Sequence, residues 1–419
     1  MGRILNASTL LDHGHRAGRR LMLDILEAGL RAADPYYATL GALCRHGDML
    51  TVGGDLYAPA HSPLPGPEVI DLRRVGRIFV LGAGKGIQGA ARALEETLGD
   101  RLTGGVVIDK HGTPRCLERI EVVYGAHPIP DEGCARGCER ILEIARELRP
   151  DDLVFTLQGN GTGSLLTLPA AGVSLEDVRQ VVYTFQIERG GPTVDLIPIR
   201  NHLDRMKGGQ FSRCLQLARV VHLIAFYRPP SYAEMLASPN YRWLHTLPDE
   251  TTFADAVERM HKWDVWETAP QAVRDYLTRG DQRHETLKNA EFEAMRSRVF
   301  FIFPPELGMV PTARARAEQL GLRTHVLFDN YTMLVEASQA GRIVANLALR
   351  SEQAGDPFTP PVALLSSGEM LVTVGQARGM GGRNQEYGVS AALEIGGARR
   401  IVMASVDSDG TDGPGHQFV

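Results

Sequence analysis

Glycines lie beside a lysine at residues 82–86, in an arrangement that could bind an anion. Glycines let backbone N–H groups approach a ligand, and the N-terminus of a following helix adds the positive end of its dipole. Lys85 adds a full positive charge. The segment is not a Walker A loop, because Gly86 follows the lysine and the required spacing is absent. We therefore expect a phosphate or carboxylate to bind at Gly84 and Lys85.

Two other interpretations of this segment stay open. Gly84, Gly86 and Gly89 match the G-x-G-x-x-G fingerprint of dinucleotide-binding proteins, and Asp109 follows at the spacing of a ribose-binding acid. This pattern would suit an NAD(P)-dependent reductase. The predicted strand, however, runs directly into Gly82, and a fingerprint counted from there lacks its third glycine. The last alternative is a tight turn between a strand and a helix.

A second glycine-rich segment follows another apolar run, at residues 158–164. It alternates glycines with amide and hydroxyl side chains, which would give a loop of exposed N–H and O–H donors. We expect these donors to bind the phosphate oxygens of a nucleotide, and a plain surface turn is the alternative. The residues concerned are Gly159, Asn160, Gly161, Thr162, Gly163 and Ser164.

Charged residues accompany glycines in three later segments. Arg200 and Lys207 could lie on nearby faces of a helix, and a solvated basic face is the alternative. Arg383 follows two glycines at a predicted helix start, where a cation is unfavourable unless an anion compensates it. The loop around Asp409 and Asp412 suits either Mg²⁺ shared with phosphates or a solvated acidic turn. The residues that could orient a ligand or metal ion after the arginine are Asn384, Gln385 and Glu386.

Alternating strands and helices must position these residues. Apolar strands without polar alternation indicate a parallel sheet covered on both faces, and such sheets bind ligands at the carboxyl ends of their strands. The predicted fold class is α/β, with a Rossmann-like parallel sheet in the N-terminal domain and a smaller α/β C-terminal domain. The predicted strands are 77–81, 105–109, 120–124, 153–157, 220–225, 299–303, 324–328, 362–365, 371–374 and 400–404.

Helical periodicity completes the prediction of two domains. A polar stretch over 278–296 marks the boundary between them. We expect an N-terminal domain over 1–285 and a C-terminal domain over 286–419, with the ligand bound in the cleft between the two. The predicted helices are 21–30, 87–98, 134–148, 175–189, 253–260, 271–277, 312–320, 334–349 and 385–393.

Composition narrows the class of partner. The chain has 419 residues and a net charge of −5, from 45 Lys and Arg against 50 Asp and Glu. This mild acidity argues against nucleic acid as the ligand, since phosphate contacts require a basic face. No apolar run reaches the ~20 residues that span a bilayer, and the first residues lack the layout of a secretory signal. We expect a cytoplasmic protein that binds small metabolites.

Together these segments resemble the glycerate 2-kinase family, whose members combine an N-terminal α/β domain with a C-terminal MOFRL domain. The resemblance runs from about residue 32 to residue 413, and its most specific part is Gly-Gly-Arg-Asn-Gln-Glu at 381–386. Relatives often carry the label hydroxypyruvate reductase. The other matching segments are 84–85, 105–107, 127–131 (His-Pro-Ile-Pro-Asp), 151–154, 207–209, 367–369 and 411–413.

The resemblance implies a reaction and a role for each candidate residue. A member of this family transfers the γ-phosphoryl group of ATP, assisted by Mg²⁺, to the 2-hydroxyl of D-glycerate or a related hydroxy acid. Lys85 and Arg383 match the family's catalytic lysine and arginine. A homodimer is one assembly that we consider for the protein. Residues 159–164 and Lys207 would bind the nucleotide, Gly84, Arg200 and 384–386 the substrate, and Asp409 and Asp412 the metal ion.

Three segments depart from the family's pattern. Residues 158–164 are bulkier than the family's Ser-Gly-Gly-Gly-Ser-Ala at the point where a phosphate would touch the backbone. Residues 226–231 replace Ser-Asp-Val and Gly-Asp and lose two carboxylates. The sequence ends at Val419, before the family's Thr-Gly-Pro-Thr-Gly-Thr-Asn motif, as expected of a fragment or a shortened relative. Because these losses fall on nucleotide and metal handling, a diverged binding protein without kinase turnover is a further alternative.

Overall fold

The computed structural model describes residues 2–376, 379–410 and 412. Contacts within the chain divide it into two compact units. Pro35–Pro304 form one, called the large unit below. Met1–Asp34 and Pro305–Val419 form the other, called the small unit. Each unit has its own sheet, so the structure confirms the predicted α/β class with a Rossmann-like parallel sheet.

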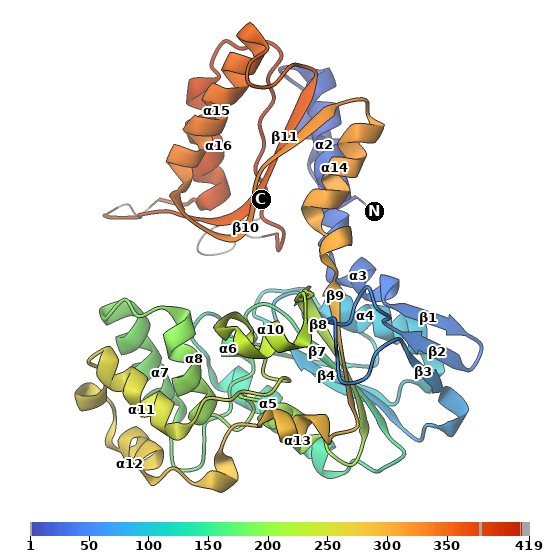
Figure 1. Cartoon of the computed structure of the whole chain (residues 1–419), viewed down its shortest axis with the longest axis vertical. Helices are drawn as coiled ribbons and strands as arrows, with labels where there is room; N and C mark the ends of the chain where they lie inside the picture. The colour runs from blue at the N-terminus through green and yellow to red at the C-terminus, as the bar shows by residue number, and fades with distance from the viewer. Residues whose placement is uncertain (1, 377–378, 411, 413–419) are drawn as a thin grey trace. The chain divides into compact units, whose positions relative to one another are not determined.

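The large unit is built on a six-stranded sheet with the order β6-β5-β4-β7-β8-β9, in which every neighbouring pair is parallel (Figure 1). From β4 the chain adds β5 and β6 on one side, then returns to add β7, β8 and β9 on the other. The strand order therefore reverses between β4 and β7, which is where sheets of this type bind ligands. The strands are β4 (Ile78–Ala83), β5 (Gly104–Lys110), β6 (Glu121–Gly125), β7 (Leu153–Gln158), β8 (Arg219–Tyr227) and β9 (Ser297–Phe303).

Residues of β4 alternate between two apolar cores. Ile78 and Val80 pack in one core with helix α4 (Ile87–Leu98). Phe79 and Leu81 pack in the other core with helix α5 (Glu132–Arg146). Both faces of the central strand are thus buried, which is why the strand is a continuous apolar run in the sequence.

Further elements surround this sheet. A three-stranded antiparallel sheet has the order β1-β2-β3. Helices α7, α8, α11 and α12 share a separate apolar core around Phe185 and Phe253. The elements are α3 (Pro35–Gly41), β1 (Leu43–His46), β2 (Met49–Val52), β3 (Glu68–Asp71), α6 (Thr162–Leu165), α7 (Leu175–Tyr183), α8 (Thr193–His202), α9 (Gln210–Cys214), α10 (Tyr232–Ala237), α11 (Phe253–Lys262), α12 (Gln271–Arg279) and α13 (Asn289–Glu293).

The small unit places a parallel strand pair between two pairs of helices (Figure 1). One pair, α2 and α14, packs through Ile25, Ala313 and Ala317, and Arg316 forms an ion pair with Asp24 at 2.6 Å. The other pair is α15 and α16. The elements are α1 (Ala7–Leu10), α2 (Arg16–Ala32), α14 (Met309–Gln319), β10 (Arg323–Glu336), α15 (Ala337–Ala354), β11 (Val362–Leu371) and α16 (Arg383–Glu394).

The structure differs from the predicted organisation in three places. Because β9 is the sixth strand of the large sheet, the large unit extends to Pro304, beyond the division at 285/286. Helix α2 packs on α14, so the first 34 residues group with the small unit. The strand predicted at 362–365 extends to Leu371 as β11, so that 372–374 of the strand predicted at 371–374 lie outside it, and residues 400–404 do not form the predicted strand.

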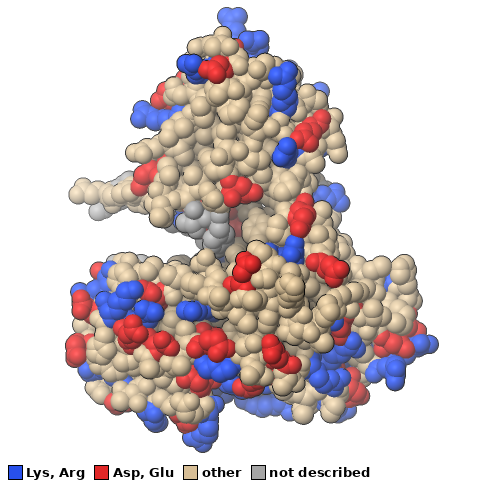
Figure 2. Space-filling view, viewed as in Figure 1, with Lys and Arg blue, Asp and Glu red and all other residues tan. Residues whose placement is uncertain are grey.

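None of the helices in the described part of the chain is both long and apolar enough to span a membrane. On the face of the large unit seen in Figure 2, basic and acidic side chains are interspersed. This face therefore has no single-sign patch that would by itself locate a ligand.

Two neighbouring glycines of β5 provide a matched test of the sheet packing. A Cβ at Gly105 would lie 1.9 Å from the carbonyl oxygen of Val80, whereas one at Gly104 would have only Arg119 O nearby, at 3.9 Å. We expect Gly105→Ala to lower the free energy of unfolding by about 2 kcal/mol or more, and Gly104→Ala to change it by less than about 0.5 kcal/mol. Urea denaturation measures both variants, and equal stabilities would contradict the pairing of β4 with β5.

Candidate functional site

The loops that follow β4 and β7 contact each other at the point where the strand order reverses. The N–H of Lys85 donates to Asn160 O at 2.7 Å, and the N–H of Gly159 donates to Ala83 O at 3.1 Å. Gly84 has φ +155°, and a Cβ there would lie 2.8 Å from the Cα of Gly159. Glycine at 84 therefore lets the two loops approach each other, and its own N–H is bonded to the backbone of β5.

The carboxylate of Asp109 occupies the N-terminus of α4. Its Oδ1 accepts the N–H groups of Gly86 at 3.0 Å and Lys110 at 2.7 Å, and its Oδ2 accepts Nε2 of Gln88 at 3.1 Å. The side chain is fully buried, and this burial raises the pKa of Asp109. The helix end expected to hold a ligand anion is thus already compensated from within.

The same contacts bear on the dinucleotide interpretation. A ribose-binding acid must present an oxygen to the ligand, but both oxygens of Asp109 are engaged by the protein. The fingerprint of Gly84, Gly86 and Gly89 therefore marks a strand-to-helix turn closed by an internal carboxylate. No contact of Asp109 favours the reductase alternative.

Two side chains flank Gly161 in the loop after β7. This glycine has φ +79°, and a Cβ on it would lie 3.0 Å from Cγ of Lys85 and 3.0 Å from Cδ2 of His127. Lys85 comes from the end of β4, and His127 follows the end of β6. The aliphatic stem of Lys85 and the imidazole of His127 thus lie at one glycine on the carboxyl edge of the sheet.

The hydroxyl groups of this loop form hydrogen bonds within the protein. The hydroxyl of Thr162 lies 2.7 Å from Ala83 O, and the hydroxyl of Ser164 donates to Ala126 O at 3.0 Å. Both hydroxyls thus have partners within the protein, and their expected role as phosphate donors stays a prediction. Three backbone N–H groups of the loop have no acceptor in the described part of the chain, namely those of Asn160, Gly161 and Gly163.

Arg200, near the end of α8, brings a second cation to the same loop. Its Nη1 lies 3.4 Å from the position a Cβ would take on Gly163. Among the described residues its only hydrogen-bond partner is Gln186 Oε1, at 3.5 Å. Burial lowers the pKa of Arg200 to about 10, against the opposing charge of Asp204. A partly buried guanidinium with a single long hydrogen bond is suited to binding an anion.

Lys207 has a different environment. The side chain is buried, and its ammonium group donates to Leu166 O at 2.7 Å, Thr167 Oγ1 at 2.8 Å and Asp204 Oδ2 at 2.5 Å. These three bonds use all the protons of the ammonium group. Lys207 therefore joins the segment after α6 to the segment after α8, and we leave it out of the proposed ligand set.

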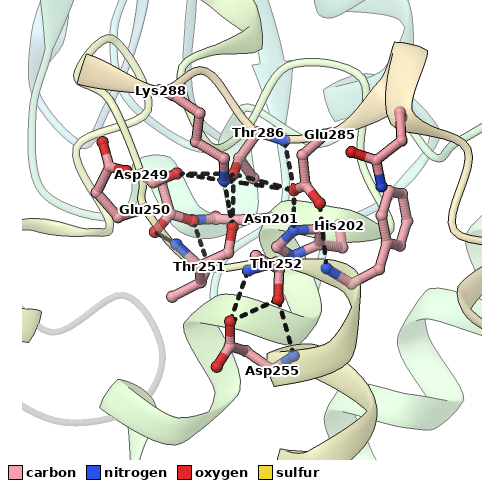
Figure 3. Close-up of polar contacts among 12 residues, drawn as sticks. Asn201, His202, Asp249, Glu250, Thr251, Thr252, Asp255, Glu285, Thr286 and Lys288 are labelled. Carbon is pink, nitrogen blue, oxygen red and sulfur yellow. Dashed lines mark hydrogen bonds and ion pairs between the residues drawn. The ribbon is translucent and has the colours of Figure 1, made fainter. Parts of the chain in front are cut away.

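A polar network fixes the end of α8, beside Arg200 (Figure 3). The ring nitrogens of His202 lie 2.7 Å from Pro198 O and 2.6 Å from Glu285 Oε1, so both face oxygen atoms of the protein. Burial alone would raise the pKa of Glu285, but the hydrogen bond from His202 and its charge outweigh this and lower the pKa to about 2. The other members of the network include Asn201, Asp249, Thr251, Thr286 and Lys288.

In the small unit, Arg383 begins α16 and forms an ion pair with Glu369 of β11 at 2.8 Å. Asp412 accepts the N–H groups of Asn384 at 3.1 Å and Gln385 at 2.8 Å. A Cβ on Gly382 would lie 2.4 Å from the carboxylate carbon of Asp412. This buried aspartate therefore caps α16, as Asp109 caps α4.

The predicted metal ligands do not form a metal centre among the described residues. Asp412 is engaged by the backbone of α16, and Asp409 lies on the exposed loop before it. Within the described ranges, no group of three or more His, Cys, Asp or Glu side chains is placed to hold a metal ion. Capping of α16 thus takes the place of the metal-binding role expected of Asp412.

The large unit brings together Gly84, Lys85, the loop over 159–164 and Arg200. Arg383 and residues 384–386 belong to the small unit, so the expected meeting of Lys85 and Arg383 in one cleft stays a prediction. His127 was not among the residues predicted to act in the site. In the sequence, His127 stands in the His-Pro-Ile-Pro-Asp segment at 127–131, and this segment was given no function in the site.

Comparisons with known proteins agree with this architecture. The family described as domain of unknown function DUF4147 matches residues 21–278, and the MOFRL family matches residues 362–417. A glycerate 2-kinase of Pyrococcus horikoshii is 31% identical over 403 residues, covering 94% of this chain and 84% of the relative. A putative hydroxypyruvate reductase of Agrobacterium vitis is 33% identical over 339 residues, covering 81% of this chain and 84% of the relative.

A crystal structure of glycerate kinase from Thermotoga maritima superposes with a TM-score of 0.71 at 25% identity, covering 94% of this chain and 84% of that one. The fold defines a two-unit α/β protein in which Lys85 and Arg200 lie at one carboxyl edge of a parallel sheet. With these matches, the chain belongs to the glycerate 2-kinase family.

The pair formed by His202 and Glu285 predicts an acid-dependent loss of stability. The pKa of Glu285 falls from 4.5 to about 2 on folding, so its contribution is complete above pH 4.5 and is lost as the pH drops toward 2. We expect Glu285→Gln to lower the free energy of unfolding by roughly 3 kcal/mol at pH 7.

Denaturation at pH 7 and at pH 3 checks this expectation, since the difference between wild type and variant should shrink at the lower pH. Glu267→Gln, on an exposed part of the large unit, is the matched control and should change stability by less than about 0.5 kcal/mol. A difference that stays constant between the two pH values would contradict the assignment.

Proposed function

We propose that the protein transfers the γ-phosphoryl group of ATP to the 2-hydroxyl of D-glycerate or of a related small hydroxy acid. One observation carries this proposal. Lys85 and Arg200 flank two glycines, Gly161 and Gly163, that are two residues apart on one loop at the reversal point of the sheet. The names of the relatives in the family support the same reaction.

The edge fits two anionic groups side by side. At Gly161, the Lys85 side chain lies beside backbone N–H groups that have no acceptor among the described residues. Phosphoryl transfer depends mainly on positioning and on neutralising the charge spread over the phosphoryl oxygens. We assign the transferred phosphoryl group to this position, and the N–H groups of Asn160 and Gly161 to its oxygens. Arg383 of the small unit would supply a second cation.

The substrate carboxylate belongs at Gly163. The planar guanidinium of Arg200 matches a carboxylate with two parallel hydrogen bonds, and its only other hydrogen-bond partner in the described chain is Gln186. In D-glycerate the carboxylate is attached to the carbon that carries the 2-hydroxyl. A substrate held by Arg200 can therefore present this hydroxyl toward the neighbouring phosphoryl position.

The described residues do not fit a metal ion held by the protein alone. The carboxylate oxygens of the two buried helix-capping aspartates, Asp109 and Asp412, accept backbone N–H groups and, at Asp109, also Nε2 of Gln88. We expect Mg²⁺ to accompany ATP and assign it no ligand in this chain. The cytoplasmic location and the homodimer also remain expectations.

Activity is tested directly with purified protein, Mg²⁺, ATP and D-glycerate, with ADP and phosphoglycerate as products. We expect ADP to form only when glycerate is present. Lys85→Met should lower turnover by ~10³ or more, by comparison with cations that act on transferring phosphoryl groups. Lys262→Met, at an exposed position of helix α11, is the control and should retain activity. Consumption of NADH with hydroxypyruvate, or no ADP from the wild type, would contradict the proposal.

Substitution of Arg200 tests the carboxylate position. Loss of a charge-assisted hydrogen bond costs about 1.5–3 kcal/mol, so we expect Arg200→Met to raise KM for D-glycerate by about 10-fold to 100-fold. The KM for ATP should stay within about 3-fold of the wild type, and Arg200→Lys should recover part of the loss. Steady-state kinetics measure both constants.

Arg205→Met provides a matched control, because this arginine is exposed and lies only five residues further along the chain. It should leave both KM values unchanged. An equal rise of KM for ATP and for glycerate in Arg200→Met would exclude a role specific to the carboxylate.

A further inference from the structure

We propose that the imidazole of His127 accepts the proton of the substrate hydroxyl during phosphoryl transfer. This inference rests on the proposed kinase function and adds a catalytic residue to it. His127 follows β6 and lies at Gly161, beside the stem of Lys85. The transferred phosphoryl group is assigned to the same position.

The backbone before His127 is anchored on both sides. The carbonyl of Ala126 accepts the hydroxyl of Ser164, which ties this turn to the loop after β7. The N–H of Ala126 donates to Asp131 Oδ1 at 3.0 Å, and Asp131 also caps α5 through Cys134 N. A residue fixed at both a loop and a helix cap can present its side chain in one geometry, as proton transfer requires.

The carboxylates of this edge are engaged by other groups. Asp109 is saturated by the N-terminus of α4. Asp131 accepts two backbone N–H groups and lies 2.8 Å from Nε2 of His111. Burial opposes ionisation of Asp131, but the bonds from His111 and the backbone lower its pKa to about 2, so it is a weak base. The imidazole of His127 is the base at this edge suited to neutral pH.

The charges around His127 come from the elements packed against it. Lys85, from the loop after β4, is the cation beside the ring. The loop after β7 contributes Gly161 and Ser164, which carry no charge. Asp131 and His111 form an ion-pair geometry on the side of β5 and α5.

The step balances within the proposed reaction. The oxygen of the substrate hydroxyl forms a bond to the γ-phosphorus, and the bond from this phosphorus to the bridging oxygen breaks. ADP leaves with that electron pair. The hydroxyl proton passes to the imidazole of His127, which becomes imidazolium and returns the proton to solvent afterwards. Lys85 and the loop N–H groups neutralise the phosphoryl oxygens meanwhile.

Kinetics of His127→Asn and His127→Ala test this role. We expect kcat to fall by about 100-fold to 10,000-fold, with KM for ATP and D-glycerate within about 3-fold of the wild type. A base must be deprotonated to act, so the rate of the wild type should fall as the pH drops below about 6.5. This fall should be absent in both variants, and added imidazole should restore part of the activity of His127→Ala.

The control is His261→Asn, at an exposed position of helix α11, which should keep both the rate and the pH profile. Thermal unfolding verifies that the variants fold, and imidazole rescue separates a proton acceptor from a structural histidine. If the wild type is active and the His127 variants keep both kcat and the fall in rate at acidic pH, the inference about His127 is wrong and the proposed function stands. A wild type inactive with ATP and glycerate overturns the proposed function, and the inference with it.

Discussion

A helix N-terminus that points at a ligand site requires a negative charge, and this chain supplies that charge from within. The first backbone N–H groups of a helix lack partners, and the helix dipole adds positive potential at the same end. Asp109 meets this requirement at α4, and Asp412 meets it at α16. We therefore propose that external anions bind at the side-chain cations and at the loop after β7, where three N–H groups have no acceptor in the described chain.

Burial of both faces of the large sheet explains which parts of the site were predictable from the sequence. The six strands of the large sheet and helices such as α4 and α5 follow from the sequence because both faces of this sheet are buried, so that apolar runs and helical periodicity are strong signals. Lys85 and the loop over 159–164 could be located for the same reason, since each directly follows a buried strand. The shared edge then follows from the parallel order of β4 and β7.

Partners of individual side chains could not be predicted, because they are set by contacts distant in sequence. The spacing of Asp109 suits a ribose-binding acid as well as a helix cap, and only its contacts with Gly86 and Gln88 distinguish the two. From the sequence alone, Lys207 resembles a ligand-binding cation. Its contacts with Leu166 and Asp204 show that its ammonium group is engaged within the protein. The division into units also depends on tertiary packing, because nothing local in α2 indicates its contact with α14.

The central claim is that external anions bind at the loop after β7 rather than at the N-terminus of α4. Amide hydrogen exchange at residue resolution, with and without a non-hydrolysable ATP analogue and D-glycerate, tests it most directly. We predict slower exchange at Asn160, Gly161 and Gly163, with no change at Gly86 and Gln88. Slower exchange at Gly86 and Gln88, with the loop unaffected, would contradict the account.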